Sequence, residues 1–295
     1  MKLPRPLLVC VALAAVSCPL GGSAVAQTAP RNAPIPDEAF QRMIPNHPGY
    51  LGALAPENLK KPRPAPPFDL TGTWFVDLRA GFNKFMFGPP YPQFHAEAQQ
   101  AVADAQQAAK EGRTYRDSIG QCYPPGMPMI MTRVWPHAFI QVPTAIYMIS
   151  GFNNAVRTIF LDGRAPSDPD IVVPSYNGES IGQWEGDTLV VTTRYFETDN
   201  HWIDSGLPIS DEFQLVERIK LVENGTVMEV EYILTDPQNW DGEWKNTKRY
   251  VRADHTDINE SHCILQYNEN LPGTNLGKAT ADARGQTEAE EDKGE

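Results

Sequence analysis

The sequence predicts a mainly β protein whose strands form an antiparallel meander and close into a lipocalin-like barrel. The first observation is Asn224-Gly225, a strong hairpin signal between two strand-like runs, 212–222 and 226–235. The second is the run from Gly182 to Thr193, in which Gly186 supplies the positive φ of a tight turn before Leu-Val-Val-Thr-Thr. Consecutive hairpins without crossover helices favour closure, because open sheet edges are a liability.

The strands are expected in a regular series bounded by turn residues. The runs are 70–78, 139–142, 145–149, 155–161, 180–184, 188–196, 212–222, 226–235, 245–253 and 261–266. The triplet Gly72-Thr73-Trp74 resembles the Gly-x-Trp of lipocalins. A turn glycine that precedes a core tryptophan would give the same triplet. One helix is predicted at about 93–112, where Ala, Gln and Glu dominate and Gly112 ends the run.

The first residues are typical of an export signal. Lys2 and Arg5 precede Leu7 to Val16, an apolar run of about ten residues that is too short to span a membrane. Ala24-Val25-Ala26 is a small-x-small cleavage site, so residues 1–26 are predicted to be a signal peptide and the mature chain to begin at Gln27. We therefore expect a periplasmic or secreted protein without an integral membrane segment.

Three further segments follow the signal peptide. Residues 27–67 are rich in proline and predict an extended arm or linker. Residues 68–270 predict the β-barrel domain, and the Gly-, Ala-, Thr- and acid-rich tail, 271–295, is predicted to be disordered. The chain has 37 acidic and 25 basic residues, a formal net charge of −12, which argues against a nucleic-acid partner.

Export determines which redox state we expect for the cysteines. Cys10 and Cys18 lie in the signal peptide, where lipidation at Cys18 is an alternative to cleavage after residue 26. Cys122 and Cys263 remain, and an even count in an oxidising compartment favours one disulfide. The alternatives are two buried free thiols or a nucleophilic Cys122.

Several motifs occur in one order over about half of the chain. They are Cys122–Pro128 (CYPPGMP), Ile159–Arg164, Ser180–Val191 (SIGQWEGDTLVV), Trp202–Asp204, Ser210–Asp211, Glu217–Arg218, Asp236–Pro237, Cys263 and Asn268–Asn270. With these motifs the chain resembles a family of uncharacterised exported bacterial proteins. The resemblance implies the compartment, the disulfide and the fold, but no reaction. The family often has a histidine where this chain has Ile209, and His201 is a candidate to replace it.

Two histidines are candidate proton-transfer groups, because imidazole titrates near neutral pH. His201 stands in a loop with Trp202 and Asp204, which we expect to contact a ligand. The alternative is a polar loop without a functional role, covered by the tryptophan. His137 precedes a strand and follows Arg133, and either Arg133 or Arg157 is expected to hold an anionic group of a ligand.

A third candidate is Glu217 beside Arg218. Neighbours on a strand point to opposite faces, so only one of them can face the interior. An inward Glu217 could act as an acid or a base, or could form a structural ion pair with an inward Arg157.

Aromatic residues are the last indication of function. The residues are Trp74, Trp135, Trp184, Trp202, Trp240 and Trp244, with Phe82, Phe85 and Phe87. They predict either a pocket for an apolar or aromatic ligand, to which we assign Trp135, Trp184 and Trp202, or ordinary core packing. No metal-ligand motif, phosphate loop, dinucleotide fingerprint or serine-hydrolase elbow occurs in the sequence, so we expect no metal and no cofactor.

These observations support three hypotheses about function. The first is an exported, cofactor-free lyase, isomerase or hydrolase that uses His137, His201 and Glu217 on a small hydrophobic or aromatic metabolite. The second is a non-catalytic carrier or sensor of such molecules. The third is an envelope interaction module that works through the proline-rich arm.

Overall fold

The computed structural model describes residues 34–45, 49–81, 86–112, 118–203 and 206–264. The chain divides into two compact units, residues 1–48 and 49–295. The described part of the first unit contains α1 (Asp37–Met43), which has no buried residue. The predicted signal peptide, 1–26, and the predicted tail, 271–295, lie outside the described residues.

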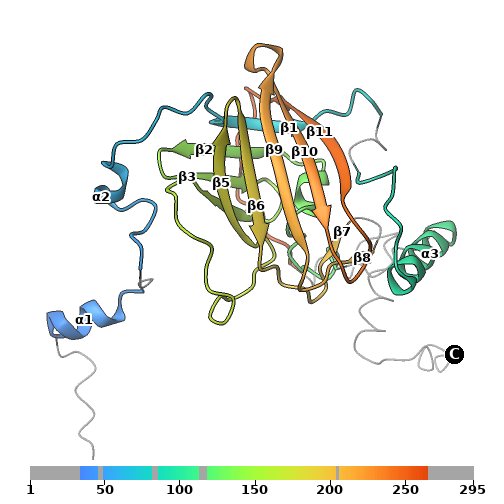
Figure 1. Cartoon of the computed structure of the whole chain (residues 1–295), viewed down its shortest axis with the longest axis horizontal. Helices are drawn as coiled ribbons and strands as arrows, with labels where there is room; N and C mark the ends of the chain where they lie inside the picture. Colours follow the sequence, from blue (N-terminus) through green and yellow to red (C-terminus); the bar gives the residue numbers. More distant parts are fainter. Residues whose placement is uncertain (1–33, 46–48, 82–85, 113–117, 204–205, 265–295) are drawn as a thin grey trace, which may run out of the picture. The chain divides into compact units, whose positions relative to one another are not determined.

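Nine strands of the described residues close into one barrel (Figure 1). Their order around the barrel is β1-β11-β10-β9-β6-β5-β4-β3-β2. They are β1 (Gly72–Val76), β2 (His137–Val142), β3 (Ala145–Ser150), β4 (Val156–Phe160), β5 (Glu179–Glu185), β6 (Thr188–Arg194), β9 (Gln214–Val222), β10 (Val227–Thr235) and β11 (Trp244–Arg252). β7 (Trp202–Ile203) and β8 (Leu207–Pro208) form a separate pair. The predicted lipocalin-like β-barrel is confirmed.

One pair of neighbouring strands departs from the predicted meander. β4 and β5 run parallel and pair only at Ile159 with Ser180 and at Phe160 with Ile181. All the other neighbouring pairs in the barrel are antiparallel. A parallel neighbour needs a long connection, which is the stretch from Leu161 to Gly178. The sheet is therefore mixed, and its ladder is shortest between β4 and β5.

The predicted helix is present as α3 (Ala96–Lys110). Its buried face consists of four alanines, Ala98, Ala101, Ala105 and Ala108, and it packs on β8. Small side chains allow close approach, and alanine has the highest helix propensity. The amide of His95 donates to the carbonyl of Asn239 (2.8 Å), which ties the start of α3 to the loop before β11.

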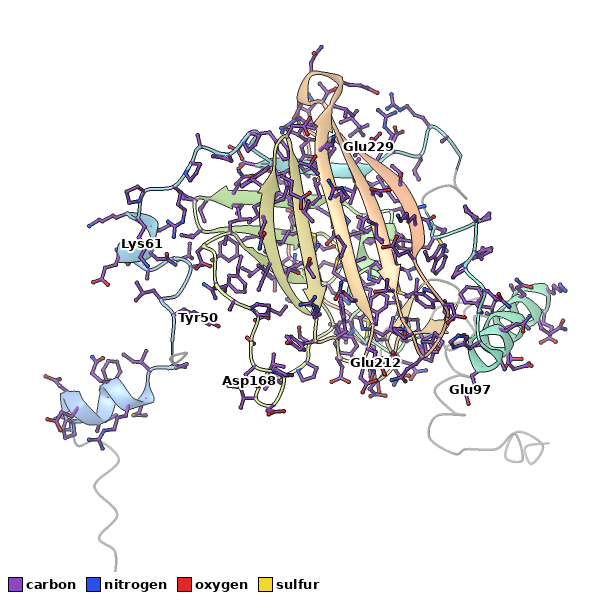
Figure 2. The ribbon with its side chains drawn as sticks, in the orientation of Figure 1. Tyr50, Lys61, Glu97, Asp168, Glu212 and Glu229 are labelled. Carbon is purple, nitrogen blue, oxygen red and sulfur yellow. A yellow bond between two sulfur atoms is a disulfide. The ribbon has the colours of Figure 1, made fainter. Side chains whose placement is uncertain are left out.

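The arm from Gly49 to Pro67 is held against the barrel, and it contains α2 (Pro56–Leu59). The Thr144 hydroxyl donates to the carbonyl of Ala53 (2.7 Å). The guanidinium of Arg164 lies 4.0 Å from the ring centroid of Tyr50, a residue labelled in Figure 2, and 3.7 Å from that of Phe160. This part of the predicted arm therefore wraps the barrel wall through cation–π contacts.

The last predicted strand, 261–266, is not borne out where it is described: Ser261 to Ile264 form no strand. The backbone of this segment bonds to one side chain instead of to a neighbouring strand. The Asn154 side chain donates to the carbonyl of Asn259 (2.8 Å) and accepts from the amide of Ser261. Cys263 is joined to Cys122 by a disulfide with a Cα–Cα distance of 5.4 Å. The predicted disulfide is confirmed, and it fixes the C-terminal segment.

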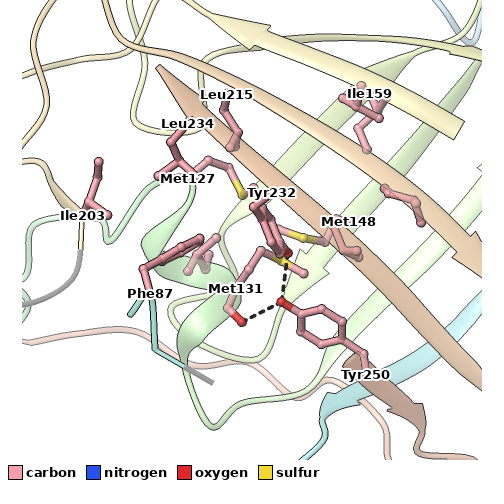
Figure 3. Close-up of a cluster of buried hydrophobic side chains, with 14 of the residues drawn as sticks. Phe87, Met127, Met131, Met148, Ile159, Ile203, Leu215, Tyr232, Leu234 and Tyr250 are labelled. Atoms are coloured by element: carbon pink, nitrogen blue, oxygen red, sulfur yellow. Dashed lines mark hydrogen bonds between the residues drawn. The ribbon is translucent and has the colours of Figure 1, made fainter. Parts of the chain in front are cut away.

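Many side chains of the described residues are buried and form one hydrophobic core cluster. Alternate residues of β9 and β10 are buried, among them Leu215 and Tyr232. The 3₁₀ helix η2 (Met129–Thr132) is fully buried and contributes Met131, which Figure 3 shows beside Tyr232 and Tyr250. Close packing of this kind is the main source of the stability of the fold.

Candidate functional site

A buried ion pair crosses the barrel interior. Arg157 on β4 donates through Nη1 to Oε1 of Glu217 on β9 (3.0 Å) and through Nη2 to Oε2. Its Nε donates to the Ser180 hydroxyl and Nη2 also donates to the Thr193 hydroxyl, both at 3.0 Å. Each side chain of the ion pair is 2% exposed. The strand period predicts the inward position of Glu217, while its neighbour Arg218 is 36% exposed.

Two tyrosines extend this polar cluster. Tyr232 lies directly across from Glu217 in the β9–β10 ladder. Tyr250 donates to the carbonyl of Met131 (3.0 Å), so Tyr232 donates to the Tyr250 oxygen (2.8 Å; Figure 3). Burial raises the pKa of both phenols, so both stay neutral at physiological pH.

His201 is buried among aromatic rings. Its Nδ1 donates to the carbonyl of Glu197 (2.7 Å), and its ring lies 5.4 Å from that of Tyr176 and 5.9 Å from that of Phe196. Burial lowers its pKa to about 4, against the opposing effect of nearby carbonyls. Gly126 packs on the same ring, because a Cβ there would lie 2.4 Å from Nε2. His201 is therefore a neutral imidazole that joins three segments.

His137 is buried in a different part of the fold. It begins β2 and pairs with Trp74 on β1 and Ser150 on β3. Its exposure is 0%, and burial lowers its pKa to about 4. Neither ring nitrogen has a hydrogen-bond partner among the described residues. The imidazole is therefore neutral near pH 7 and lies within the core.

A groove of about 520 Å³ lies where β4 and β5 diverge. Its walls are Pro124, 155–158, Phe160, Val172, Val173, 175–179 and Tyr195, and Arg157 belongs to its lining. The Asn177 side chain donates to the carbonyl of Val156 (3.0 Å) and bridges the two strands there. Figure 2 labels Asp168 on the connection that carries the two valines. A groove of this size suits a small organic molecule.

The remaining residues predicted for the site do not line this groove. Trp135 is 42% exposed and packs edge-on against Phe152. Trp184 packs edge-on against Phe68, with ring centroids 4.8 Å apart. Their roles in ligand binding stay predictions.

Three more predicted residues complete the comparison. Arg133 follows η2 directly, and Trp202 is a buried residue of β7. Asp204 lies outside the described residues. The structure therefore brings Arg157 and Glu217 together, but it does not gather the predicted catalytic groups at one cavity.

Residues that the sequence did not single out form much of the site. Tyr176, Tyr195, Val172 and Val173 line the groove, and nothing in their sequence context marks them. The position of Tyr232 could have been found, because counting outward from the Asn224-Gly225 turn places it opposite Glu217.

No protein-family model matches the chain, and no curated protein matches it. In the part of the chain that is described, no group of three or more His, Cys, Asp and Glu side chains could hold a metal ion. No helix among those residues is long and apolar enough to cross a membrane.

Proposed function

We propose that this chain is an exported barrel protein that binds a small, partly apolar organic molecule in the groove between β4 and β5 and releases it unchanged. The groove carries the proposal, because its volume of about 520 Å³ falls within the range of small-ligand sites. Its valines supply apolar area, and Val173 is 85% exposed. The disulfide is compatible with export into an oxidising compartment.

The burial of the three predicted catalytic groups, His137, His201 and Glu217, argues against catalysis by them and favours binding. Both oxygens of Glu217 accept from Arg157, and the carboxylate is 2% exposed, so it is not presented to a ligand in the groove. Among the described residues that line the groove there is no histidine. Acid–base catalysis needs a group within hydrogen-bond reach of the substrate.

An NMR titration tests this function. We would add benzyl alcohol, a neutral aromatic probe, to the isotope-labelled protein and follow the amide signals. We expect saturable shifts at Val156, Thr158 and Tyr176. Val173→Arg should abolish them by filling the groove, whereas Ile140→Arg, a change at an exposed apolar position on β2, should not. Unmoved groove amides up to the solubility limit of the probe would overturn the proposal.

Catalysis by Glu217 is the second candidate, and one observation favours it. Arg157 is both the partner of Glu217 and a lining residue of the groove, so a bound molecule would touch the same hydrogen-bond network. This function predicts that a ligand is chemically changed during incubation and that Glu217→Gln stops the change while binding survives. Mass spectrometry of recovered ligand decides the matter, and unchanged ligand contradicts catalysis.

A further inference from the structure

Two phenols that line the groove already donate their protons to backbone carbonyls. The Tyr176 hydroxyl donates its hydrogen bond to the carbonyl of Asp199 (2.8 Å). The Tyr195 hydroxyl donates to the carbonyl of Ser167 (2.9 Å). Each phenolic oxygen keeps lone pairs but has no further proton to give.

The lining carboxylate adds to this set. Glu179 accepts from the amide of Ser167 (2.9 Å) and from its hydroxyl (2.5 Å), which fixes the carboxylate on the wall of the groove. A carboxylate oxygen has room for more than one donor, so Glu179 can still accept from a ligand. The connection that carries Val172 and the start of β5 thus hold a negative charge in place.

Arg157, a cation that lines the groove, does not offset the preference of these acceptors for a ligand that donates hydrogen bonds. Arg157 directs its Nε, one Nη1 hydrogen and both Nη2 hydrogens at Ser180, Thr193 and Glu217, inside the barrel. Its charge is matched by the paired carboxylate, and its side chain is 2% exposed. Arg157 therefore offers little to an anionic ligand.

The surroundings of the groove hold a further cation, Arg194, which lies directly across from Glu179 in the β5–β6 ladder and donates to the Gln214 side chain, and two carboxylates, Asp199 and Glu197. Burial raises the pKa of Tyr176, and the charges of Asp199 and Glu197 raise it further. These carboxylates are therefore close enough to act on the phenol. The whole chain carries a formal net charge of −12. A cation gains in such a field, and an anion is repelled.

We infer that the groove selects an organic cation, a primary amine on an apolar or aromatic body. This inference rests on the proposed function, because it specifies the ligand of the same groove. The ammonium would donate to Glu179 and to the phenolic oxygens, while its apolar body would cover Val156 and Val173. A charge-assisted hydrogen bond is about twice as strong as a neutral one.

Three probes of nearly equal shape test the inference. They are benzylamine, benzyl alcohol and benzoate, which are cationic, neutral and anionic at pH 7. We expect benzylamine to bind about tenfold more tightly than benzyl alcohol at low ionic strength. Added salt should reduce this difference, because exposed charges are screened. Benzoate should bind most weakly.

Glu179→Gln is the matching variant, since the amide keeps the shape of the side chain and removes its charge. It should weaken benzylamine several-fold and leave benzyl alcohol unchanged. Glu229→Gln is the control, because Glu229 is a carboxylate on the outer face of β10, labelled in Figure 2 and far from β5 in strand order. Should Glu179→Gln perturb the fold, the salt dependence measured on the unchanged protein still decides.

The outcomes separate this inference from the function on which it rests. If benzyl alcohol or benzoate binds as tightly as benzylamine, the groove binds small molecules and the selection of amines is refuted. If none of the three probes shifts a groove amide, the proposed function fails with it. If Glu229→Gln weakens benzylamine as much as Glu179→Gln does, the effect comes from net charge and the assignment of Glu179 is refuted.

Discussion

Arg157 on β4 and Glu217 on β9 pair across the barrel interior, although β5 and β6 separate their strands in the sheet. The ion pair spans the inner side of four consecutive strands, because the guanidinium also donates to Ser180 on β5 and to Thr193 on β6. A buried ion pair of this kind adds little net stability compared with apolar residues, but breaking it is costly. We therefore interpret the ion pair as a contact that fixes the arrangement of these four strands.

Removal of one partner should reveal this cost. Glu217→Ala leaves the guanidinium of Arg157 buried and unpaired, so we expect a loss of about 3–5 kcal/mol in the free energy of unfolding. Urea denaturation measures it. Glu229→Ala, on the outer face of β10, should cost less than about 1 kcal/mol. The double variant Arg157→Met/Glu217→Leu should recover much of the loss, and equal effects of the Glu217 and Glu229 changes would contradict this interpretation.

The buried histidines should make the protein less stable in mild acid. The pKa of His137 is lowered from 6.5 to about 4 by burial. The unfolded chain therefore binds more protons between these values, and stability falls as pH falls from about 6.5 to about 4. For one group this amounts to about 2 kcal/mol between pH 7 and pH 5. His201, whose pKa is lowered in the same way, adds to the effect.

His137→Phe isolates the contribution of His137. The packing effect of the substitution is independent of pH, so the difference in unfolding free energy between pH 7 and pH 5 should shrink by about 2 kcal/mol. Urea denaturation at the two pH values measures this difference. An unchanged difference would show that His137 takes up no proton on unfolding in this range.

The disulfide should be a large contributor to stability, because it joins residues 141 positions apart. Reduction of the bond between Cys122 and Cys263 should cost about 2–5 kcal/mol. The measurement is the thermal midpoint with and without dithiothreitol. The variant Cys122→Ser/Cys263→Ser should unfold at the reduced midpoint and ignore the reductant. Equal midpoints for the oxidised and reduced protein would contradict the prediction.

The contact between Gly126 and His201 can be tested with a matched glycine. Both Gly126 (φ +64°) and Gly186 (φ +59°) have left-handed backbones. A Cβ at Gly126 would lie 2.4 Å from His201 Nε2 and 2.5 Å from the carbonyl oxygen of Tyr176, whereas a Cβ at Gly186 would meet nothing within 4 Å. Both alanine substitutions carry backbone strain of about 1 kcal/mol. Gly126→Ala should cost about 1–3 kcal/mol more, measured by urea denaturation. Equal costs would contradict the close packing of Gly126, because both the His201 ring and the Tyr176 backbone would then have moved away freely.

Local patterns were enough to predict the barrel. The Asn224-Gly225 turn fixes the register of β9 and β10, with Val222 opposite Val227. The strand period then turns Glu217 inward. Residues 261–266 were predicted as a strand, but where they are described, at 261–264, hydrogen bonds to Asn154 and the disulfide of Cys263 hold the chain instead.

The groove could not be predicted, because it depends on one long-range pairing. The connection from Leu161 to Gly178 has no periodic pattern, and nothing local states that it returns β5 parallel to β4. That arrangement is what leaves Val156 and Val173 facing a groove. The sequence pointed to histidines and tryptophans, whereas the residues that line the groove include three valines and two tyrosines but no histidine and no tryptophan.

A crystal of the protein soaked with 4-bromobenzyl alcohol would test the central claim most directly. Bromine scatters anomalously, so its position is independent of any assumption about the site. We predict an anomalous peak between Val156 and Val173, and its loss in Val173→Arg crystals. A peak found only elsewhere, or no peak in crystals that tolerate the probe, would contradict the assignment of the groove.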